Sequence, residues 1–100
     1  MGREEHEKKT KKTRILVIDE HATVREGLTR LINDEPGFTV AAEAENAEQA
    51  LDTISKQEVD LVIVDVSLES TTGTRLTEEI KSRCPHMPVL VLPVSNFLEK

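Results

Sequence analysis

Four short apolar runs alternate along the chain with stretches whose apolar residues recur at helical spacing. The runs are ILVI, FTVAA, LVIV and VLVL, at residues 15–18, 38–42, 61–64 and 89–92. The first and third contain only Val, Ile and Leu, without alternating polar residues, which is typical of parallel strands covered on both faces. Strands and helices that alternate with short connections require right-handed crossovers and a parallel sheet. The pattern therefore predicts an α/β fold.

Three amphipathic stretches separate the runs and predict three helices. Thr23 and Glu26 have the spacing of a capping box at the start of the first helix, which we expect to end at the Asp-Glu-Pro-Gly segment at 34–37. Asn46 and Gln49 have the same spacing before the second helix, with Asn46 as the cap.

The size and charge of the chain limit what it can be. One hundred residues suffice for one small domain, and the longest apolar runs fall far short of the roughly 20 residues of a membrane helix. No apolar stretch follows the first basic residues, which excludes a secretory signal at this end. A net charge of -6 argues against direct nucleic acid binding. We therefore expect a cytoplasmic chain with no membrane contact.

The first residues differ in composition from the rest. Residues 1–13 mix acidic and basic side chains with threonine and offer little to a core. We expect them to be a disordered charged arm and residues 14–100 to form the domain.

Acidic side chains follow two of the predicted strands directly. Asp19 and Glu20 follow the first run, and Asp65 follows the third. Ligands of open parallel sheets bind beyond the carboxyl ends of the strands, so neighbouring first and third strands would bring three carboxylates together. Their mutual repulsion would be relieved by a hard divalent cation, of which oxygen ligands favour Mg²⁺. The alternative is that each acid caps a helix or lies in solvent, and three acids at one edge favour the cation site.

Two segments, ILVIDEHATVREGLTRLI and DLVIVDVSLESTTGTRL, resemble the receiver domain of bacterial two-component response regulators, of the type usually fused to a helix-turn-helix output domain. The resemblance covers roughly residues 14–94. It implies a flavodoxin-like, doubly wound parallel sheet of order 2-1-3-4-5, of which this chain holds four strands in the order 2-1-3-4.

The resemblance also implies roles for individual residues. Asp65 would accept a phosphoryl group from the phosphohistidine of a sensor histidine kinase or phosphotransfer protein. Asp19 and Glu20 would hold Mg²⁺ together with Asp65, and the backbone carbonyl of Ser67 would supply another ligand. Such a module in phosphorelay signalling is a phosphoacceptor with at most weak self-catalysed phosphoryl transfer, and not an enzyme.

The sequence departs from the family pattern at two places. Pro93 stands at the switch position, where the family has Ser or Thr, and it offers neither a hydroxyl nor a backbone donor. The chain ends at Lys100, before the family's last strand, its final helices and its catalytic lysine. We therefore expect a truncated receiver with impaired phosphoryl acceptance. Its strand at 89–92 would be an exposed edge that favours a homo-oligomer. The alternative is a non-catalytic pseudo-receiver, a receiver-like domain that acts only in dimerisation or protein docking.

Two other readings of the acidic segments fail. VIDEHA is similar to the acidic strand of helicase-type nucleotidases, but the chain has no G-x-x-x-x-G-K-[ST] phosphate loop. The D-V-S segment is similar to haloacid dehalogenase phosphatases, but their second aspartate falls where Ser67 stands.

Overall fold

A single parallel sheet organises the molecule. The computed structural model describes residues 11–65 and 72–92. Within them the sheet has the order β2-β1-β3-β4, and every pair of neighbouring strands is parallel. The predicted strand order is confirmed. The strands are β1 (Thr13–Ile18), β2 (Phe38–Ala44), β3 (Leu61–Asp65) and β4 (Val89–Leu92).

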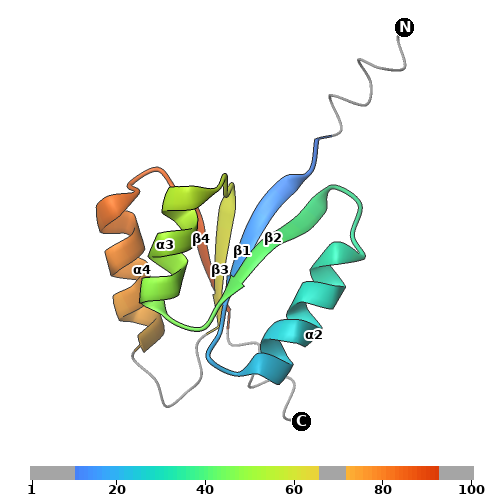
Figure 1. The fold of residues 1–100 in the computed structure, drawn as a ribbon, viewed down its shortest axis with the longest axis horizontal. Coiled ribbons are helices and arrows are strands. Elements are labelled where there is room, and N and C mark those ends of the chain that lie inside the picture. The colour runs from blue at the N-terminus through green and yellow to red at the C-terminus, as the bar shows by residue number, and fades with distance from the viewer. Residues whose placement is uncertain (1–10, 66–71, 93–100) are drawn as a thin grey trace, which may run out of the picture.

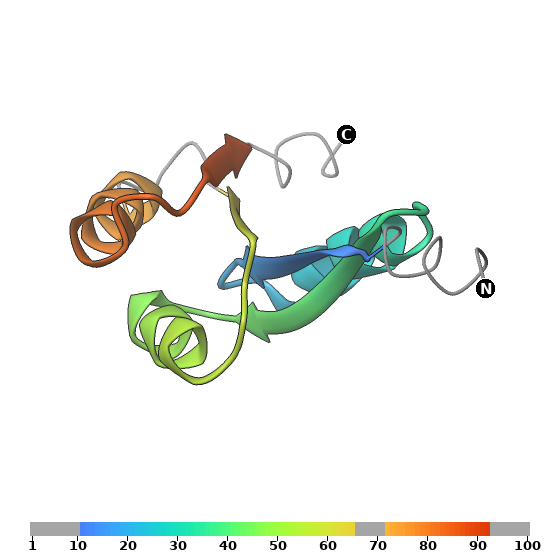
Figure 2. The same cartoon turned by 90° about the horizontal axis from the view of Figure 1, so that it is seen from above.

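Helices cover the sheet on both faces, as a doubly wound fold requires (Figure 1). α3 (Ala47–Lys56) and α4 (Thr72–Arg83) lie together on one face, and α2 (Ala22–Asn33) lies on the other. Figure 2 shows the same layers from above, with α3 and α4 side by side. The flavodoxin-like architecture predicted from the sequence is therefore confirmed for the described residues.

The alternation of side chains along β1 and β3 divides the core into two layers. Leu16 and Ile18 face α3 and α4, whereas Ile15 and Val17 face α2. The larger layer is completed by buried residues of β2, α3, β3 and α4: Ala44, Ala50, Val62, Val64, Leu76 and Ile80. Because both faces of β1 are buried, its four residues at 15–18 are all apolar.

The two predicted helix caps have opposite outcomes. Asn46 caps α3, since its Oδ1 accepts a hydrogen bond of 2.9 Å from the Gln49 amide. The capping box predicted at Thr23 and Glu26 is wrong, because α2 begins at Ala22 and its N-cap is His21, two residues before Thr23. The physical reason is that Asp19 Oδ1 accepts a hydrogen bond from the His21 amide, which fixes the backbone at His21 and starts the helix there.

The turn between α2 and β2 follows the sequence prediction. Gly37 has a φ of 97°, in the left-handed region that favours glycine, and its carbonyl accepts a hydrogen bond from the Thr13 amide. Residues 1–10 of the predicted charged arm lie outside the described residues, and β1 begins at Thr13. No helix in the described part of the chain is long and apolar enough to cross a membrane.

Candidate functional site

Asp19 is the buried acid at the carboxyl end of β1. Its residue is only 3% exposed, although aspartate is rarely buried without a partner. Its amide donates to the Ala44 carbonyl of β2 at 3.0 Å, and its Oδ1 accepts a hydrogen bond of 3.0 Å from the His21 amide. The His21 Nδ1 also lies 3.2 Å from the same oxygen. The backbone around Asp19 therefore fixes which way the carboxyl points.

Asp65 ends β3 beside this position. Ile18 pairs with Val64 in the register of β1 and β3, so the next residue of each strand is an aspartate. Burial raises the pKa of the Asp19 carboxyl, the His21 amide lowers it, and the Asp65 carboxyl raises it again, with a net increase. The structure therefore brings two of the three predicted acids together.

The second oxygen of the Asp19 carboxyl is left without a hydrogen bond in the described part of the chain. Oδ2 is buried and has no hydrogen-bond donor among the described residues. A hydrogen bond between the Asp19 and Asp65 carboxyls forms only when one of the two carries a proton, because a pair of carboxylates has no donor. A divalent cation with oxygen ligands fits this arrangement of a buried acceptor and a second carboxyl, since Mg²⁺ is usually held by one or two carboxylates.

The remaining predicted site residues are placed differently. Glu20 is exposed, and within residues 11–65 and 72–92 no three Asp, Glu, His or Cys side chains are grouped so as to hold a metal ion. The described structure thus contains an acidic pair and not the expected group of three. Ser67 and Pro93 lie outside the described residues.

A second layer of polar contacts holds the Asp19 segment and was missed by the sequence analysis. Arg25 of α2 donates from Nη1 to the Asp19 carbonyl at 2.6 Å and from Nε to Glu43 Oε1 of β2 at 2.9 Å. Glu43 Oε2 in turn accepts a hydrogen bond from Thr29. No local pattern relates Arg25 to Glu43, because they are 18 residues apart and meet where α2 packs on β2.

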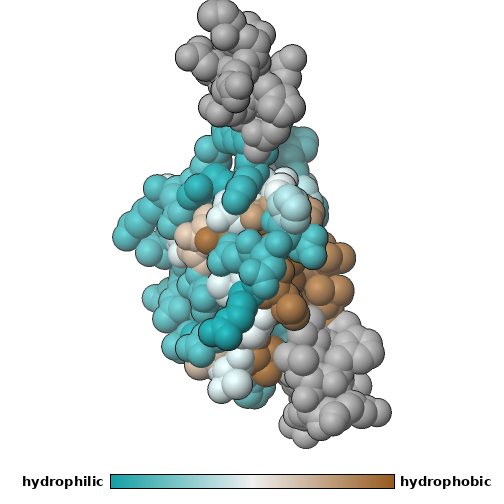
Figure 3. All heavy atoms as spheres, turned by 90° about the vertical axis from the view of Figure 1, so that its right-hand side faces the viewer, coloured by the Kyte–Doolittle hydropathy of each residue, from teal (hydrophilic) through white to brown (hydrophobic). Residues whose placement is uncertain are grey.

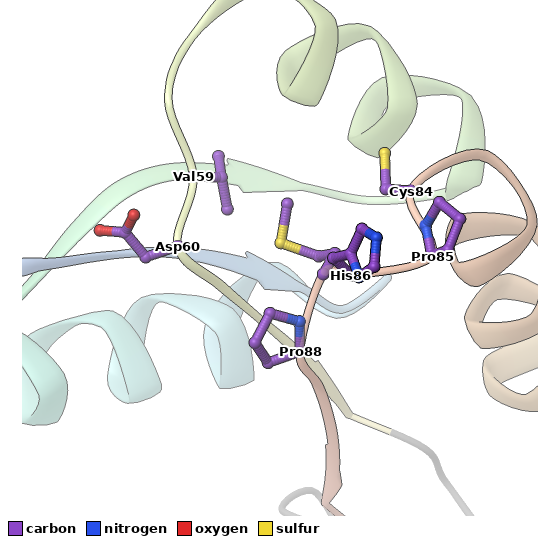
Figure 4. Close-up of a pocket in the computed structure, with 7 residues that line it drawn as sticks. Val59, Asp60, Cys84, Pro85, His86 and Pro88 are labelled. Carbon is purple, nitrogen blue, oxygen red and sulfur yellow. The ribbon is translucent and has the colours of Figure 1, made fainter.

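A separate cavity of about 370 Å³ lies at the opposite end of the sheet, before β3 and β4. Figure 4 shows its lining, in which Val59, Pro85, Met87 and Pro88 are apolar. The Asp60 carboxyl lies apart from the Cys84 and His86 side chains in this view, and it accepts a hydrogen bond from the Arg14 amide. The polar groups of the cavity therefore do not converge on one point, and the pair of Asp19 and Asp65 is the better candidate for a functional site.

Comparison with known proteins identifies the family of the chain. Residues 15–98 match the family model described as "Response regulator receiver domain". The chain is 34% identical over 85 residues to the transcriptional regulatory protein DegU of Brevibacillus brevis and 31% identical over 85 residues to the nitrate/nitrite response regulator protein NarL of Escherichia coli. These matches cover 85% of this chain but only 36% of DegU and 39% of NarL.

Solved structures give the same result. A two-component response regulator of the LuxR family from Aurantimonas sp. superposes with a TM-score of 0.72 at 33% identity, over 81% of this chain and 58% of that chain. The signal receiver domain of the putative response regulator NarL from Mycobacterium tuberculosis superposes with a TM-score of 0.63 at 26% identity, over 81% and 64% of the two chains.

Proposed function

Because this chain belongs to the response regulator receiver domain family, we propose that it accepts a phosphoryl group on Asp65 in two-component phosphorelay signalling. Receiver domains of this type interact with histidine kinases or phosphotransfer proteins, and they are generally phosphoacceptors and not classical enzymes. The observation that supports the proposal is the approach of Asp65 to Asp19, whose buried Oδ2 has no donor among the described residues.

In the proposed transfer, an oxygen of the Asp65 carboxylate forms the new bond to phosphorus. The bond from phosphorus to the donor's imidazole nitrogen breaks, and that nitrogen keeps the electron pair and later takes up a proton. Asp65 ends as a mixed carboxylic-phosphoric anhydride. Two negative groups must approach each other in this step, next to the charge of Asp19, so the reaction is slow unless that charge is offset.

Receiver domains generally bind Mg²⁺ at the phosphorylation site, and the donors here are those that Mg²⁺ prefers. We propose that Asp19 and Asp65 hold the ion, together with Glu20 and the backbone carbonyl of Ser67. When bound, the ion would stabilise the charge that develops on the transferring phosphoryl oxygens. The fixed His21 amide keeps Asp19 Oδ1 occupied, which leaves Oδ2 available to the ion.

Two further elements of the proposal rest on the sequence. Pro93 has no hydroxyl to close onto a phosphoryl group, so we propose that the switch which follows phosphorylation is impaired. The histidine kinase or phosphotransfer partner acts from the cytoplasm in this family, and we propose the same compartment for this chain.

The experiment is phosphorylation by a small donor. Incubation with acetyl phosphate and MgCl₂ should add the mass of one phosphoryl group to the intact protein, and Asp65→Asn should abolish the addition. Asp52→Asn is the matched control, because it removes a carboxylate that is 59% exposed on α3 and paired with Lys56. An unchanged mass of the wild-type chain, or equal labelling of Asp65→Asn, would overturn the proposal.

A second candidate function, the pseudo-receiver that associates without phosphorylation, is favoured by one observation. β4 pairs only with β3 among the described strands, and its Leu90 and Val91 are each 45% exposed. Figure 3 shows apolar atoms gathered on one flank of the molecule, and the exposed large apolar residues of the described chain are Leu31, Phe38, Leu90 and Val91. We propose a homo-oligomer through the β4 edge, since an open strand edge pairs readily with a second copy.

A further inference from the structure

Arg25 is tied to β2 and to the segment that follows β1, although these bonds do not include the Asp19 or Asp65 carboxyls. Its guanidinium, in a side chain only 13% exposed, donates at 2.6 Å to the backbone carbonyl of Asp19 and at 2.9 Å to Glu43. Glu43 is itself held by Thr29 at 3.0 Å. The planar fork of arginine allows both bonds at once, which a lysine ammonium on its flexible stem does not reproduce.

The bonds of Arg25 complete the set of hydrogen bonds that hold the Asp19 backbone. The Asp19 amide is held by Ala44 at 3.0 Å, and its carbonyl is held by Arg25, so both peptide groups of the residue are tied. The carboxyl then has one oxygen on the His21 amide and the other left buried without a donor among the described residues. Without Arg25, the peptide that joins Asp19 to Glu20 would be free to rotate, and the direction of Oδ2 would no longer be set.

The charge of Arg25 does not explain this arrangement. Glu43 lies 2.9 Å from the guanidinium and offsets its charge, so little of that charge is left to attract the acidic pair. The contact with Asp19 is to the carbonyl and not to the carboxylate. What Arg25 supplies to the site is therefore geometry.

We infer that Arg25, oriented by Glu43, is a positioning residue that holds the Asp19 carboxyl in the direction needed to bind a divalent cation. The inference rests on the proposed function of the acidic pair as the cation and phosphoryl site. It assigns a role to residues that touch neither the cation nor the phosphoryl group.

The test compares three variants with the wild type. Arg25→Gln removes the fork and one positive charge. Arg25→Gln combined with Glu43→Gln removes the fork but leaves no unpaired glutamate, which restores the charge balance and protects the fold. Lys56→Gln is the matched control, because it removes the same charge from a side chain that is 71% exposed on α3.

Two readouts are measured at a temperature well below the melting of every variant. Without metal, hydrogen exchange of the His21 amide reports whether the Asp19 carboxyl still holds it. With Mg²⁺, calorimetric titration gives the cation affinity. We expect about tenfold faster exchange of the His21 amide in both Arg25 variants, as for the loss of a charge-assisted bond. We also expect about tenfold weaker Mg²⁺ binding, as for the loss of an outer contact of a metal ligand.

The direction in which the Mg²⁺ affinity changes distinguishes a positioning role of Arg25 from an effect of its charge and from an effect on folding stability. Loss of a positive charge alone strengthens cation binding, so Lys56→Gln should bind Mg²⁺ as well as the wild type or slightly better. Recovery of Mg²⁺ affinity in the Arg25→Gln/Glu43→Gln variant would show a purely structural role and overturn the inference. Unchanged His21 exchange would also overturn it. If the wild type binds no Mg²⁺ while His21 exchange rises in both Arg25 variants, the positioning of Asp19 stands and the proposed function fails.

Discussion

Asp65 lies against Asp19 so that its carboxyl adds to the effect of burial in raising the pKa of Asp19. The relationship follows from the sheet, because Ile18 and Val64 are paired in adjacent parallel strands and each is followed by an aspartate. Two carboxylates at such close quarters repel each other, and the burial of one of them removes the water that would screen the repulsion. Either a proton or a cation relieves this unfavourable pairing, which links the stability of the fold to pH and to metal.

The pH dependence of Asp19→Asn follows from the raised pKa. Between the ordinary aspartate value of 3.8 and the higher pKa in the fold, the native state binds more protons than the unfolded state. The free energy of unfolding of the wild type therefore falls as pH rises through this window. Asp19→Asn abolishes this loss, so we expect it to be more stable than the wild type at pH 7, with the difference shrinking as pH falls towards 3.8. Urea unfolding at a series of pH values measures this.

The control for this prediction is Asp52→Asn on exposed α3. The difference in free energy of unfolding between Asp52→Asn and the wild type should not grow as pH rises. A constant difference for Asp19→Asn across the series would contradict the raised pKa of Asp19.

Magnesium should stabilise the wild type and leave the site variants unchanged. A cation that binds only the folded wild type raises its melting temperature by mass action, and the rise grows with the logarithm of its concentration. Asp19→Asn and Asp65→Asn each lose one carboxylate ligand of the acidic pair, so MgCl₂ should not change their melting temperatures. Differential scanning calorimetry with MgCl₂ at constant ionic strength measures the shift, and Asp52→Asn should retain it. A wild-type melting temperature that MgCl₂ leaves unchanged would contradict a cation site.

Glu20 is the predicted ligand that the described structure leaves exposed. We expect Glu20→Gln to weaken Mg²⁺ binding by less than Asp19→Asn does, because an exposed side chain must give up conformational freedom to reach the ion. Calorimetric titration of both variants with Mg²⁺ gives the order of their affinities. Equal affinities of Glu20→Gln and the wild type would remove Glu20 from the ligand set.

The elements of the fold were predictable because each strand and helix leaves a local pattern. Val, Ile and Leu runs without alternation mark β1 and β3, and VLVL matches β4 over its full length, Val89–Leu92. The same patterns place an acid after β1 and after β3, so the approach of Asp19 to Asp65 required only that the two strands be neighbours.

What the sequence did not reveal depends on contacts between distant segments. The direction of the Glu20 side chain depends on its own torsion angles, which no residue spacing determines. The bond between Arg25 and Glu43 arises from the packing of α2 on β2, two elements that bring together residues far apart in the sequence. The start of α2 was misplaced because an aspartate two residues away, Asp19, occupies the amide of the capping residue.

Substitutions at the observed cap Asn46 and at the predicted cap Thr23 test which of the two residues stabilises its helix. Asn46→Ala should lower the free energy of unfolding by about 1 kcal/mol, because the Gln49 amide loses its acceptor. Thr23→Ala should cost little, since Thr23 is an exposed residue inside α2 and alanine is the better helix former. Urea unfolding of both variants decides between them. A larger loss for Thr23→Ala would restore the capping box that the sequence predicted.

Association through β4 is tested by placing a charge on its edge. If two copies pair there, Leu90→Lys should shift the protein towards the monomer, since lysine on an edge strand opposes pairing. A groove beside β4 is lined by Ile15, Leu31, Phe38, Ile63 and Leu90. Leu31→Lys is the matched control, because Leu31 is an exposed leucine of α2 that lines this groove but not the strand edge. Light scattering over a range of protein concentrations should then show fewer dimers for Leu90→Lys and a wild-type distribution for Leu31→Lys. Loss of dimers in both variants would move the contact from the strand edge to the groove, and a wild type that is monomeric at every concentration would exclude the association altogether.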